Sequence, residues 1–237
     1  MSTNFDGRDA RLLAMLIDGD NAQPKLLEQI LAEVAKHGLV TTRRIYGDWT
    51  EPQMSGWKNN LHSFAVQPVQ QFRYTVGKNA TDSALIIEAM DLLHSGSVHG
   101  FCIVSSDSDY TRLATRIRES GLFVMGIGRS NTPKSFVNAC EVFVYTENLT
   151  PKKDKGKKNK EKPSTEWIEL VSQAVDMASR EDGWTLLSVV GINLQKLDPA
   201  FDTRTFGYAK LSQLIESHSA QFELKRESSH YIVRFKG

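Results

Sequence analysis

Short apolar runs alternate with helical patterns through the first 150 residues, and this alternation constrains the fold more than any other feature. The apolar runs predict strands at Leu12–Ile17, Val40–Tyr46, Phe64–Val69, Phe101–Ser105, Leu122–Ile127 and Val142–Tyr145. Apolar residues three and four positions apart predict helices from Pro24 to a stop at Gly38, and at Trp57–Ser63, Asp82–His94, Tyr110–Ser120 and Pro133–Cys140. Strands that alternate with helices form a mostly parallel sheet covered on both faces, so we expect an α/β fold here.

The last part of the chain has a different pattern. Helices are expected around the apolar positions of residues 167–178, at Leu186–Leu194 and at Arg204–Ser217. Two further runs, Gln221–Arg226 and His230–Phe235, flank a Glu-Ser-Ser turn and predict a β-hairpin. Three helices followed by a hairpin indicate a small α+β domain of the winged-helix type.

A lysine-rich segment at residues 151–163 separates the two patterns. Its sequence, PKKDKGKKNKEKP, has seven lysines, two acidic residues and no large apolar residue. Such a segment cannot bury enough surface to offset the entropy lost on ordering. We therefore expect a flexible linker between one domain at residues 1–150 and another at residues 164–237.

The formal net charge of +1 conceals an uneven distribution. Basic and acidic residues number 14 and 16 in residues 1–150, 7 and 2 in the linker, and 8 and 10 in residues 164–237, which gives −2, +5 and −2. A lysine run is often only a solubilising spacer, but this one is a cationic tether between two mildly acidic domains. The near-neutral total therefore does not exclude a nucleic-acid partner.

The composition excludes several classes of protein. A chain of 237 residues with 40% hydrophobic residues and two cysteines is neither collagenous, nor wholly disordered, nor held together by disulfides. No uncharged stretch approaches the roughly 20 apolar residues of a membrane span. No basic segment followed by an apolar run marks a secretory signal, so we expect a cytoplasmic protein with Cys102 and Cys140 as reduced core thiols.

Acidic residues follow two of the predicted strands directly. Asp18 and Asp20 come after the first strand, and Asp107 and Asp109 come after the fourth. In an open parallel sheet, ligands bind beyond the carboxyl ends of the strands, where the strand order reverses. If the order is 3-2-1-4-5, the first and fourth strands are neighbours at that point and the two acidic clusters share one crevice. Asp82, at the start of the long helix, supplies a further acid.

Carboxylates gathered this closely repel one another unless a cation neutralises them. Oxygen ligands without His or Cys favour Mg²⁺ or Mn²⁺. Such an ion lowers the pKa of a bound water so that the water can attack phosphorus, and phosphodiester hydrolysis then needs no nucleophilic side chain. Aspartates at helix starts are also common caps, but two clusters at the ends of separate strands favour the metal-site interpretation.

At these residues the chain resembles an NYN domain of the LabA-like type, a branch of the PIN-like nucleases. The resemblance covers residues 11–149 and rests on Asp-Gly-Asp-Asn at 18–21, Lys-Asn-Ala-Thr-Asp at 78–82 and Ser-Ser-Asp-Ser-Asp-Tyr at 105–110. It implies a Rossmann-like three-layer α/β/α fold and a hydrolase, a Mg²⁺- or Mn²⁺-dependent ribonuclease. The positions that match the family's catalytic, metal-binding acids are Asp18, Asp82, Asp107 and Asp109, with Asp20 at a more variable position.

Polar, basic and aromatic residues near these acids are candidate RNA contacts. Asn21, Ser105 and Ser106 could donate hydrogen bonds to a phosphate or hold the carboxylates, and Arg44, Lys78 and Lys134 could guide the RNA backbone. The aromatic residues considered for stacking on unpaired bases are Tyr46, Trp49, Trp57 and Tyr74, of which Trp49 is expected to be the most exposed.

The C-terminal part resembles an OST-HTH/LOTUS domain through Gly183-Trp184, Val190-Gly191 and the run Phe-Asp-Thr-Arg-Thr-Phe-Gly-Tyr at 201–208. This resemblance implies a winged helix-turn-helix that binds RNA and, in some members, protein. Arg204 and Lys210 are candidate phosphate contacts. The expected partner is single-stranded or structured RNA and no membrane, while a homodimer and a protein bound through this domain are left open.

Three functions compete at this stage. The first is a metal-dependent ribonuclease in which the C-terminal domain and the tether hold RNA near the crevice. The second is an RNA-binding adaptor with an inactive or slow nuclease site. The third is a haloacid-dehalogenase-like phosphatase with Asp18 as nucleophile and Asp20 as general acid and base, but Ala22 stands where that family has Thr or Val. The four matching aspartates favour the ribonuclease.

Overall fold

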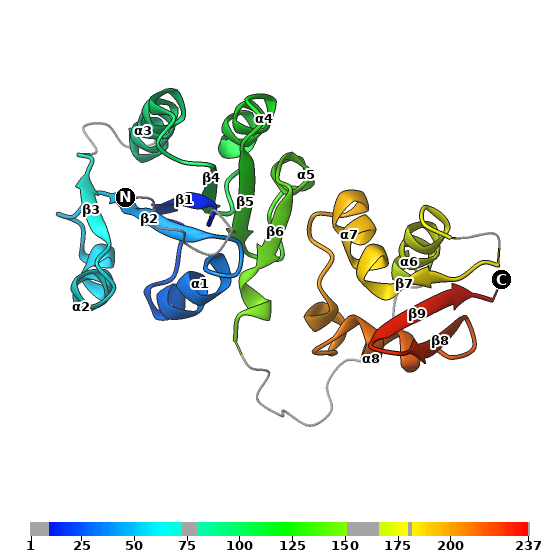
Figure 1. The fold of residues 1–237 in the computed structure, drawn as a ribbon. Helices are drawn as coiled ribbons and strands as arrows, with labels where there is room; N and C mark the ends of the chain where they lie inside the picture. The colour runs from blue at the N-terminus through cyan, green and yellow to red at the C-terminus, as the bar shows by residue number, and fades with distance from the viewer. Residues whose placement is uncertain (1–9, 73–79, 151–165, 180–181, 237) are drawn as a thin grey trace, which may run out of the picture. The chain divides into compact units, whose positions relative to one another are not determined.

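A parallel six-stranded sheet forms the centre of the N-terminal unit (Figure 1) in this computed structural model, which describes residues 10–72, 80–150, 166–179 and 182–236. The chain divides into two compact units, Met1–Thr150 and Pro151–Gly237. The sheet has the order β3-β2-β1-β4-β5-β6. Its strands are β1 (Leu12–Asp18), β2 (Leu39–Gly47), β3 (Gln67–Gln70), β4 (Gly100–Val104), β5 (Phe123–Gly128) and β6 (Val142–Tyr145). The first and fourth strands are therefore neighbours, as the expected shared crevice requires.

Helices cover both faces of this sheet. One face carries α1 (Leu27–Val34) and α2 (Lys58–Ser63), and the other carries α3 (Ala80–Ser95), α4 (Thr111–Glu119) and α5 (Lys134–Ala139), as Figure 1 shows. Short 3-10 turns lie at Pro24–Leu26, Pro52–Trp57, Ser108–Tyr110 and Thr146–Asn148. The predicted three-layer α/β/α class is confirmed. Within the described ranges, no helix combines the length and the apolar character that a membrane span needs.

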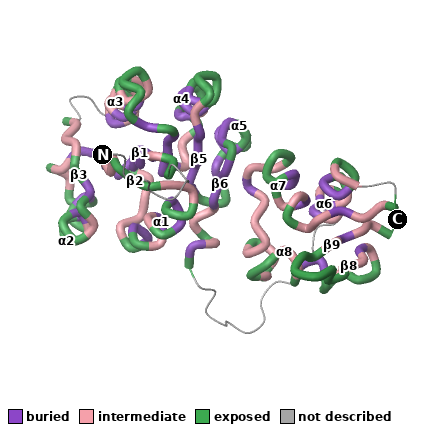
Figure 2. Tube along the Cα trace, in the orientation of Figure 1, coloured by how far each residue is buried: buried purple, intermediate pink, exposed green. Residues whose placement is uncertain are grey.

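Side chains along β1 alternate between the two helical layers. Leu13, Met15 and Ile17 share one core cluster with Ile30 of α1 and with Trp57. Because successive side chains of a strand point to opposite faces, the side chain of the terminal Asp18 lies on the α3 side of the sheet. Figure 2 shows the central strands buried and the outer surfaces of α3 and α4 exposed.

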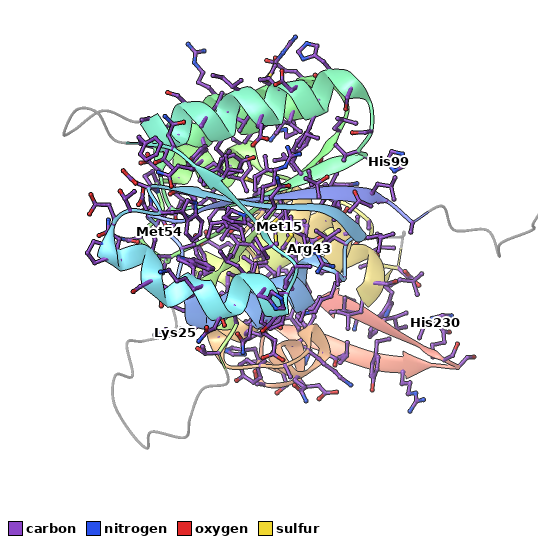
Figure 3. The ribbon with its side chains drawn as sticks, turned by 90° about the vertical axis from the view of Figure 1, so that its left-hand side faces the viewer. Met15, Lys25, Arg43, Met54, His99 and His230 are labelled. Carbon is purple, nitrogen blue, oxygen red and sulfur yellow. The ribbon has the colours of Figure 1, made fainter. Side chains whose placement is uncertain are left out.

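Met54 packs beneath the loops that leave β1 and β2. Met54 and Met15 both lie in the interior of the N-terminal unit (Figure 3) and are almost completely buried. A Cβ atom would lie 2.5 Å from Met54 Cε at Gly47 and 2.7 Å from it at Gly19. The two glycines therefore leave room for this methyl group, which supports the chain where the acidic residues emerge.

The third strand is shorter than the sequence suggested. The apolar run predicted a strand from Phe64, but β3 begins at Gln67. Phe64 is the residue that caps the C-terminal end of α2, and the following Ala65 has a φ of 50°, which lies in the left-handed region rather than the β region. Phe64 instead packs at the border of the core, which explains its apolar character.

The C-terminal unit has a winged-helix arrangement, as expected. It consists of α6 (Glu166–Asp176), β7 (Thr185–Leu186), α7 (Leu187–Leu197), a 3-10 turn at Thr203–Phe206, α8 (Leu211–Glu216), β8 (Phe222–Glu227) and β9 (His230–Phe235). Its antiparallel sheet has the order β7-β9-β8, so β7 adds a short strand to the predicted hairpin. The lysine-rich segment lies outside the described residues, so its flexibility stays a prediction.

The helix predicted at Arg204–Ser217 is wrong as a single element. The chain forms a 3-10 turn that ends at Phe206, and α8 begins only at Leu211. Gly207 separates them with a φ of 88°, a conformation that glycine adopts without strain. Asp202 caps the turn by accepting a 2.8 Å hydrogen bond from the backbone N of Arg204. Apolar spacing alone did not reveal this interruption.

Candidate metal centre

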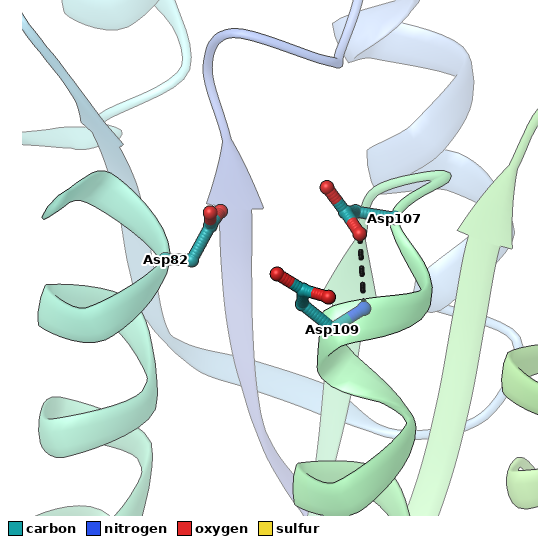
Figure 4. Close-up of side chains that lie close together, drawn as sticks. All are labelled: Asp82, Asp107 and Asp109. Carbon is teal, nitrogen blue, oxygen red and sulfur yellow. Dashed lines mark hydrogen bonds between the residues drawn. The ribbon is translucent and has the colours of Figure 1, made fainter. Parts of the chain in front are cut away.

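Three aspartates converge at the carboxyl edge of the sheet. Each of Asp82, Asp107 and Asp109 offers one carboxylate oxygen, and these three oxygens all lie within 4.8 Å of one another. Asp82 comes from the first turn of α3, Asp107 follows β4, and Asp109 belongs to the 3-10 turn before α4 (Figure 4). Asp82 and Asp109 are 27 positions apart in the sequence, and they form one acidic group with Asp107.

Asp82 is half-buried, and a tyrosine holds its carboxylate. The hydroxyl of Tyr110 donates a 2.6 Å hydrogen bond to Asp82 Oδ1. Burial raises the pKa of Asp82, and the charges of Asp107 and Asp109 raise it further, while the Tyr110 hydrogen bond lowers it. The ionised carboxylate is therefore unfavourable in the protein alone, and a bound cation would stabilise it.

The loop that follows β4 is ordered by its own polar groups. Asp107 Oδ1 accepts a 2.9 Å hydrogen bond from the backbone N of Asp109, shown dashed in Figure 4, and so caps the turn. The backbone N of Asp107 donates to Ser105 Oγ at 3.1 Å. Asp107 therefore both caps the turn and belongs to the acidic group, so its role as a cap does not argue against a metal site.

Asp18 lies beside this group rather than within it. It is 1% exposed, and its Oδ2 accepts hydrogen bonds from Asn21 Nδ2 at 2.7 Å and from Ser105 Oγ at 2.8 Å. Its Oδ1 accepts from the backbone N of Asp20 at 3.2 Å. Burial raises the pKa of Asp18, the bonds from Asn21 and Ser105 lower it, and the charge of Asp82 raises it. Asp18 thus ties the end of β1 to the start of the Asp107 loop.

The remaining polar candidates lie around this edge. Asp20 is exposed, and its Oδ2 accepts a 3.3 Å hydrogen bond from Thr81 Oγ1. Ser106 Oγ accepts from the backbone N of Arg129 at 2.9 Å. Ser105, only 2% exposed, is placed to hold Asp18 rather than to reach solvent. The structure therefore brings the acidic residues and their polar neighbours together. Ser105 is buried among them, whereas Asp20 is exposed.

The basic candidates are more scattered. Arg44 Nη1 forms a 2.8 Å ion pair with Glu88 Oε1 of α3, and Arg204 Nη2 forms a 2.6 Å pair with Asp202 Oδ2. Lys134 and Lys210 are exposed, at the start of α5 and immediately before α8. Lys78 lies outside the described residues. Their roles in RNA binding stay predictions, and for Arg44 and Arg204 any phosphate would compete with a carboxylate.

Two of the three aromatic stacking candidates that the structure describes are buried. Tyr46 and Trp57 are buried in the core, so the stacking role considered for them is wrong. Trp49 is half-buried and, as expected, the most exposed of the candidates that the structure describes. Its indole Nε1 donates a 3.0 Å hydrogen bond to the Val69 carbonyl oxygen, and the residue packs against the core. Tyr74 lies outside the described residues.

Sequence reasoning did not single out three neighbours of the acidic group. Tyr110 and Thr81 donate to Asp82 and Asp20, and each directly adjoins an aspartate in the sequence, which is the signal that could have identified it. Arg129 follows β5, and it lines a small hollow together with Asn21, Ser106 and Thr146. The position of Arg129 near this site could be recognised only from the tertiary structure, because the parallel sheet brings the ends of β4 and β5 together.

Gly128 allows β5 to pass close to this network. A Cβ atom there would lie 2.5 Å from the Ser105 carbonyl oxygen and 2.7 Å from Thr132 Oγ1. We expect Gly128→Ala to lower the free energy of unfolding by about 1–3 kcal/mol, because Ser105 must shift. Urea unfolding measures this, and Gly56→Ala is the control, since its Cβ would meet only Pro24 Cγ at 3.4 Å. Equal stability of the two variants would contradict the prediction.

The phosphatase alternative receives no support from this geometry. Its nucleophile would be Asp18, which is almost fully buried with hydrogen-bond donors at both carboxylate oxygens. A nucleophile must instead approach the phosphorus atom of its substrate closely. The acidic group at the carboxyl edge of the sheet, in which Asp109 is exposed, is formed by other residues.

Comparison with known proteins agrees with this fold. The family model of the NYN domain matches residues 12–147, and that of the OST-HTH/LOTUS domain matches residues 158–233. A protein of unknown function from Vibrio parahaemolyticus RIMD 2210633 is 16% identical with a TM-score of 0.50, over 60% of this chain and 96% of that one, which supports the fold alone. An uncharacterized protein of Nitrosomonas europaea is 26% identical with a TM-score of 0.31, over 37% of this chain and 88% of that one.

No match to a curated protein was found. The two family models match successive, non-overlapping parts of the sequence. The first of them spans the whole central sheet, from β1 to the turn after β6, and so includes every residue of the acidic group. Because that model covers more than half of the sequence, the chain belongs to the NYN family, with an OST-HTH/LOTUS domain following its NYN domain.

Proposed function

We propose that this protein is a metal-dependent ribonuclease that hydrolyses RNA phosphodiester bonds. The observation that carries the proposal is the convergence of Asp82, Asp107 and Asp109 within 4.8 Å at the carboxyl edge of an NYN-domain sheet. NYN domains belong to the PIN-like nuclease superfamily, and OST-HTH/LOTUS domains are RNA-binding modules. The domain pair therefore supports RNA as the substrate class.

The donor set at this edge fits a hard divalent cation. The three residues offer only carboxylate oxygens, which suit Mg²⁺ and Mn²⁺ better than softer metals. Burial and the charges of Asp107 and Asp109 raise the pKa of Asp82, and a neighbouring cation would oppose both effects. When bound, the cation would lower the pKa of a coordinated water and stabilise negative charge that develops on the phosphate.

The protein itself supplies position and charge. Asp82, Asp107 and Asp109 would hold the cation, while Asp18 keeps Ser105 and Asn21 in place. Arg112, in the first turn of α4, and Arg129, after β5, are exposed, and neither forms an ion pair with a described residue. Their guanidinium groups are therefore available to RNA phosphates.

The test is incubation of labelled RNA and DNA of matched sequence with Mn²⁺, Mg²⁺ or EDTA. We expect cleavage of RNA in the presence of either ion and none in EDTA. Tight RNA binding without metal-dependent cleavage would contradict the proposal and favour an RNA-binding adaptor. Preferential cleavage of DNA would contradict the substrate class.

The lysine-rich segment 151–163 is expected to strengthen RNA binding without sequence preference. Replacing its seven lysines with serine should weaken RNA affinity and flatten the dependence of affinity on salt, because fewer counterions are released from the phosphates. Fluorescence anisotropy at several salt concentrations measures the slope. Lysine-to-arginine replacements keep the charge and serve as the control. An unchanged slope in the serine variant would reduce the segment to a spacer.

A further inference from the structure

We propose that Tyr110 is a positioning residue, whose hydroxyl fixes the Asp82 carboxylate in the orientation that binds the divalent cation. This inference rests on the proposed metal-dependent function. The hydroxyl donates to Asp82 Oδ1 at 2.6 Å, which links the turn before α4 to the first turn of α3. Among the described residues of the acidic group, α3 contributes Asp82 alone, and the other two aspartates come from the segment between β4 and α4. The Tyr110 hydrogen bond therefore connects Asp82 to that segment.

Tyr110 is a rigid support for that bond. The residue is completely buried, and its ring packs at a tilt against Phe136 of α5, with 6.3 Å between the ring centroids. Phe136 in turn meets Phe143 of β6 edge to face at 5.7 Å. The tyrosine ring therefore cannot reorient without disturbing the core, and its hydroxyl stays at one place.

The hydroxyl also divides the two oxygens of Asp82 between two tasks. A short hydrogen bond to a charged acceptor is stronger than one between neutral groups, and it selects one rotamer of the carboxylate. Tyr110 donates to Oδ1, so in this proposal Oδ2 is the oxygen that binds the cation. Partners that orient a metal ligand typically change metal affinity or activity by 10–100-fold when they are removed.

Tyr46 provides a matched control. It is also a completely buried tyrosine, and its hydroxyl, although close to Glu88, makes no hydrogen bond of acceptable geometry with any described residue. Tyr110→Phe and Tyr46→Phe each delete one buried hydroxyl and keep the ring. Only the first deletion removes a hydrogen bond to the acidic group, so a general effect of losing a buried hydroxyl would appear in both variants.

The experiment is a calorimetric titration of the full chain with Mn²⁺, without RNA, for four proteins: wild type, Tyr110→Phe, Tyr46→Phe and Asp82→Asn. A fifth protein, Tyr110→Phe with Asp82→Asn, completes a double-mutant cycle. We expect Tyr110→Phe to weaken Mn²⁺ affinity about 10-fold, Tyr46→Phe to leave it unchanged, and the Tyr110 effect to disappear in the Asp82→Asn background. RNA cleavage by Tyr110→Phe should recover at saturating Mn²⁺.

Two results would overturn the inference. One is equal Mn²⁺ affinity for wild type and Tyr110→Phe, and the other is an equal Tyr110 effect with and without the Asp82 carboxylate. Because the titration contains no RNA, it is independent of turnover. Wild-type protein that shows the expected Mn²⁺ pattern but cleaves no RNA would remove the proposed function and keep the role of Tyr110. Wild-type protein that binds no Mn²⁺ would contradict both.

Discussion

Asp107→Asn is expected to reduce Mn²⁺-dependent RNA cleavage by at least about 100-fold. The substitution removes one negative charge from the acidic group and replaces a carboxylate oxygen with an amide nitrogen, which does not bind Mn²⁺ or Mg²⁺. The remaining amide oxygen can still accept the hydrogen bond from the backbone N of Asp109, so the turn keeps its cap. A loss of activity therefore reports the metal site rather than unfolding.

The matched control is Asp91→Asn. Asp91 lies on the exposed side of α3, outside the acidic group, so it undergoes the same chemical change without loss of a metal ligand. Initial rates should be measured with RNA and Mn²⁺ in excess, after thermal unfolding has shown that both variants fold. Cleavage that survives Asp107→Asn at the wild-type rate would defeat the catalytic assignment.

Asp82→Asn is expected to stabilise the protein at neutral pH when no divalent ion is present. The pKa of Asp82 is raised in the folded state, so the ionised carboxylate destabilises the fold at any pH well above that raised pKa. Asparagine keeps an oxygen for the Tyr110 hydrogen bond and carries no charge. The free energy of unfolding in EDTA, from urea titrations at about pH 7, should therefore be higher for the variant.

The difference should shrink as the pH falls. Below its raised pKa, Asp82 is protonated in the folded protein, and the penalty vanishes as the pH approaches the ordinary value of 3.8. Mn²⁺ should reverse the order at neutral pH, because a ligand at 100 times its Kd stabilises the folded protein that binds it by about 2.7 kcal/mol. A variant that is less stable than wild type in EDTA at every pH would contradict the argument.

The N-terminal fold was largely predictable because its signals are local. A strand buried on both sides needs a continuous apolar run, such as residues 101–104, and a covering helix needs one apolar face. The sequence pattern failed where the backbone conformation of a single residue decided the outcome. The left-handed φ at Ala65 shortened the third strand, and that at Gly207 divided a predicted helix. Apolar spacing continues across both positions and carries no information on φ.

The candidate site was only partly predictable, for a related reason. The aspartates could be identified because each follows a strand or begins a helix, but their separation depends on how those elements pack. The structure groups Asp82, Asp107 and Asp109, and it places Asp18 in a buried network with Ser105. Burial of the aromatic candidates was not predictable either. The residue type does not distinguish a buried aromatic side chain from an exposed one, and Tyr46 and Trp57 lie in the core.

The sequence by itself determined the order of elements, the acidic residue types at the strand ends and the cationic segment between two acidic domains. These properties depend on neighbouring residues and on charge, which can be read along the chain. Only the tertiary structure decided which carboxylates meet, which one is enclosed by hydrogen-bond donors, and that Tyr110 reaches Asp82 across 28 residues. The physical reason is that metal binding and pKa depend on distances of a few ångströms, and the packing of α3 and α4 against one sheet sets those distances.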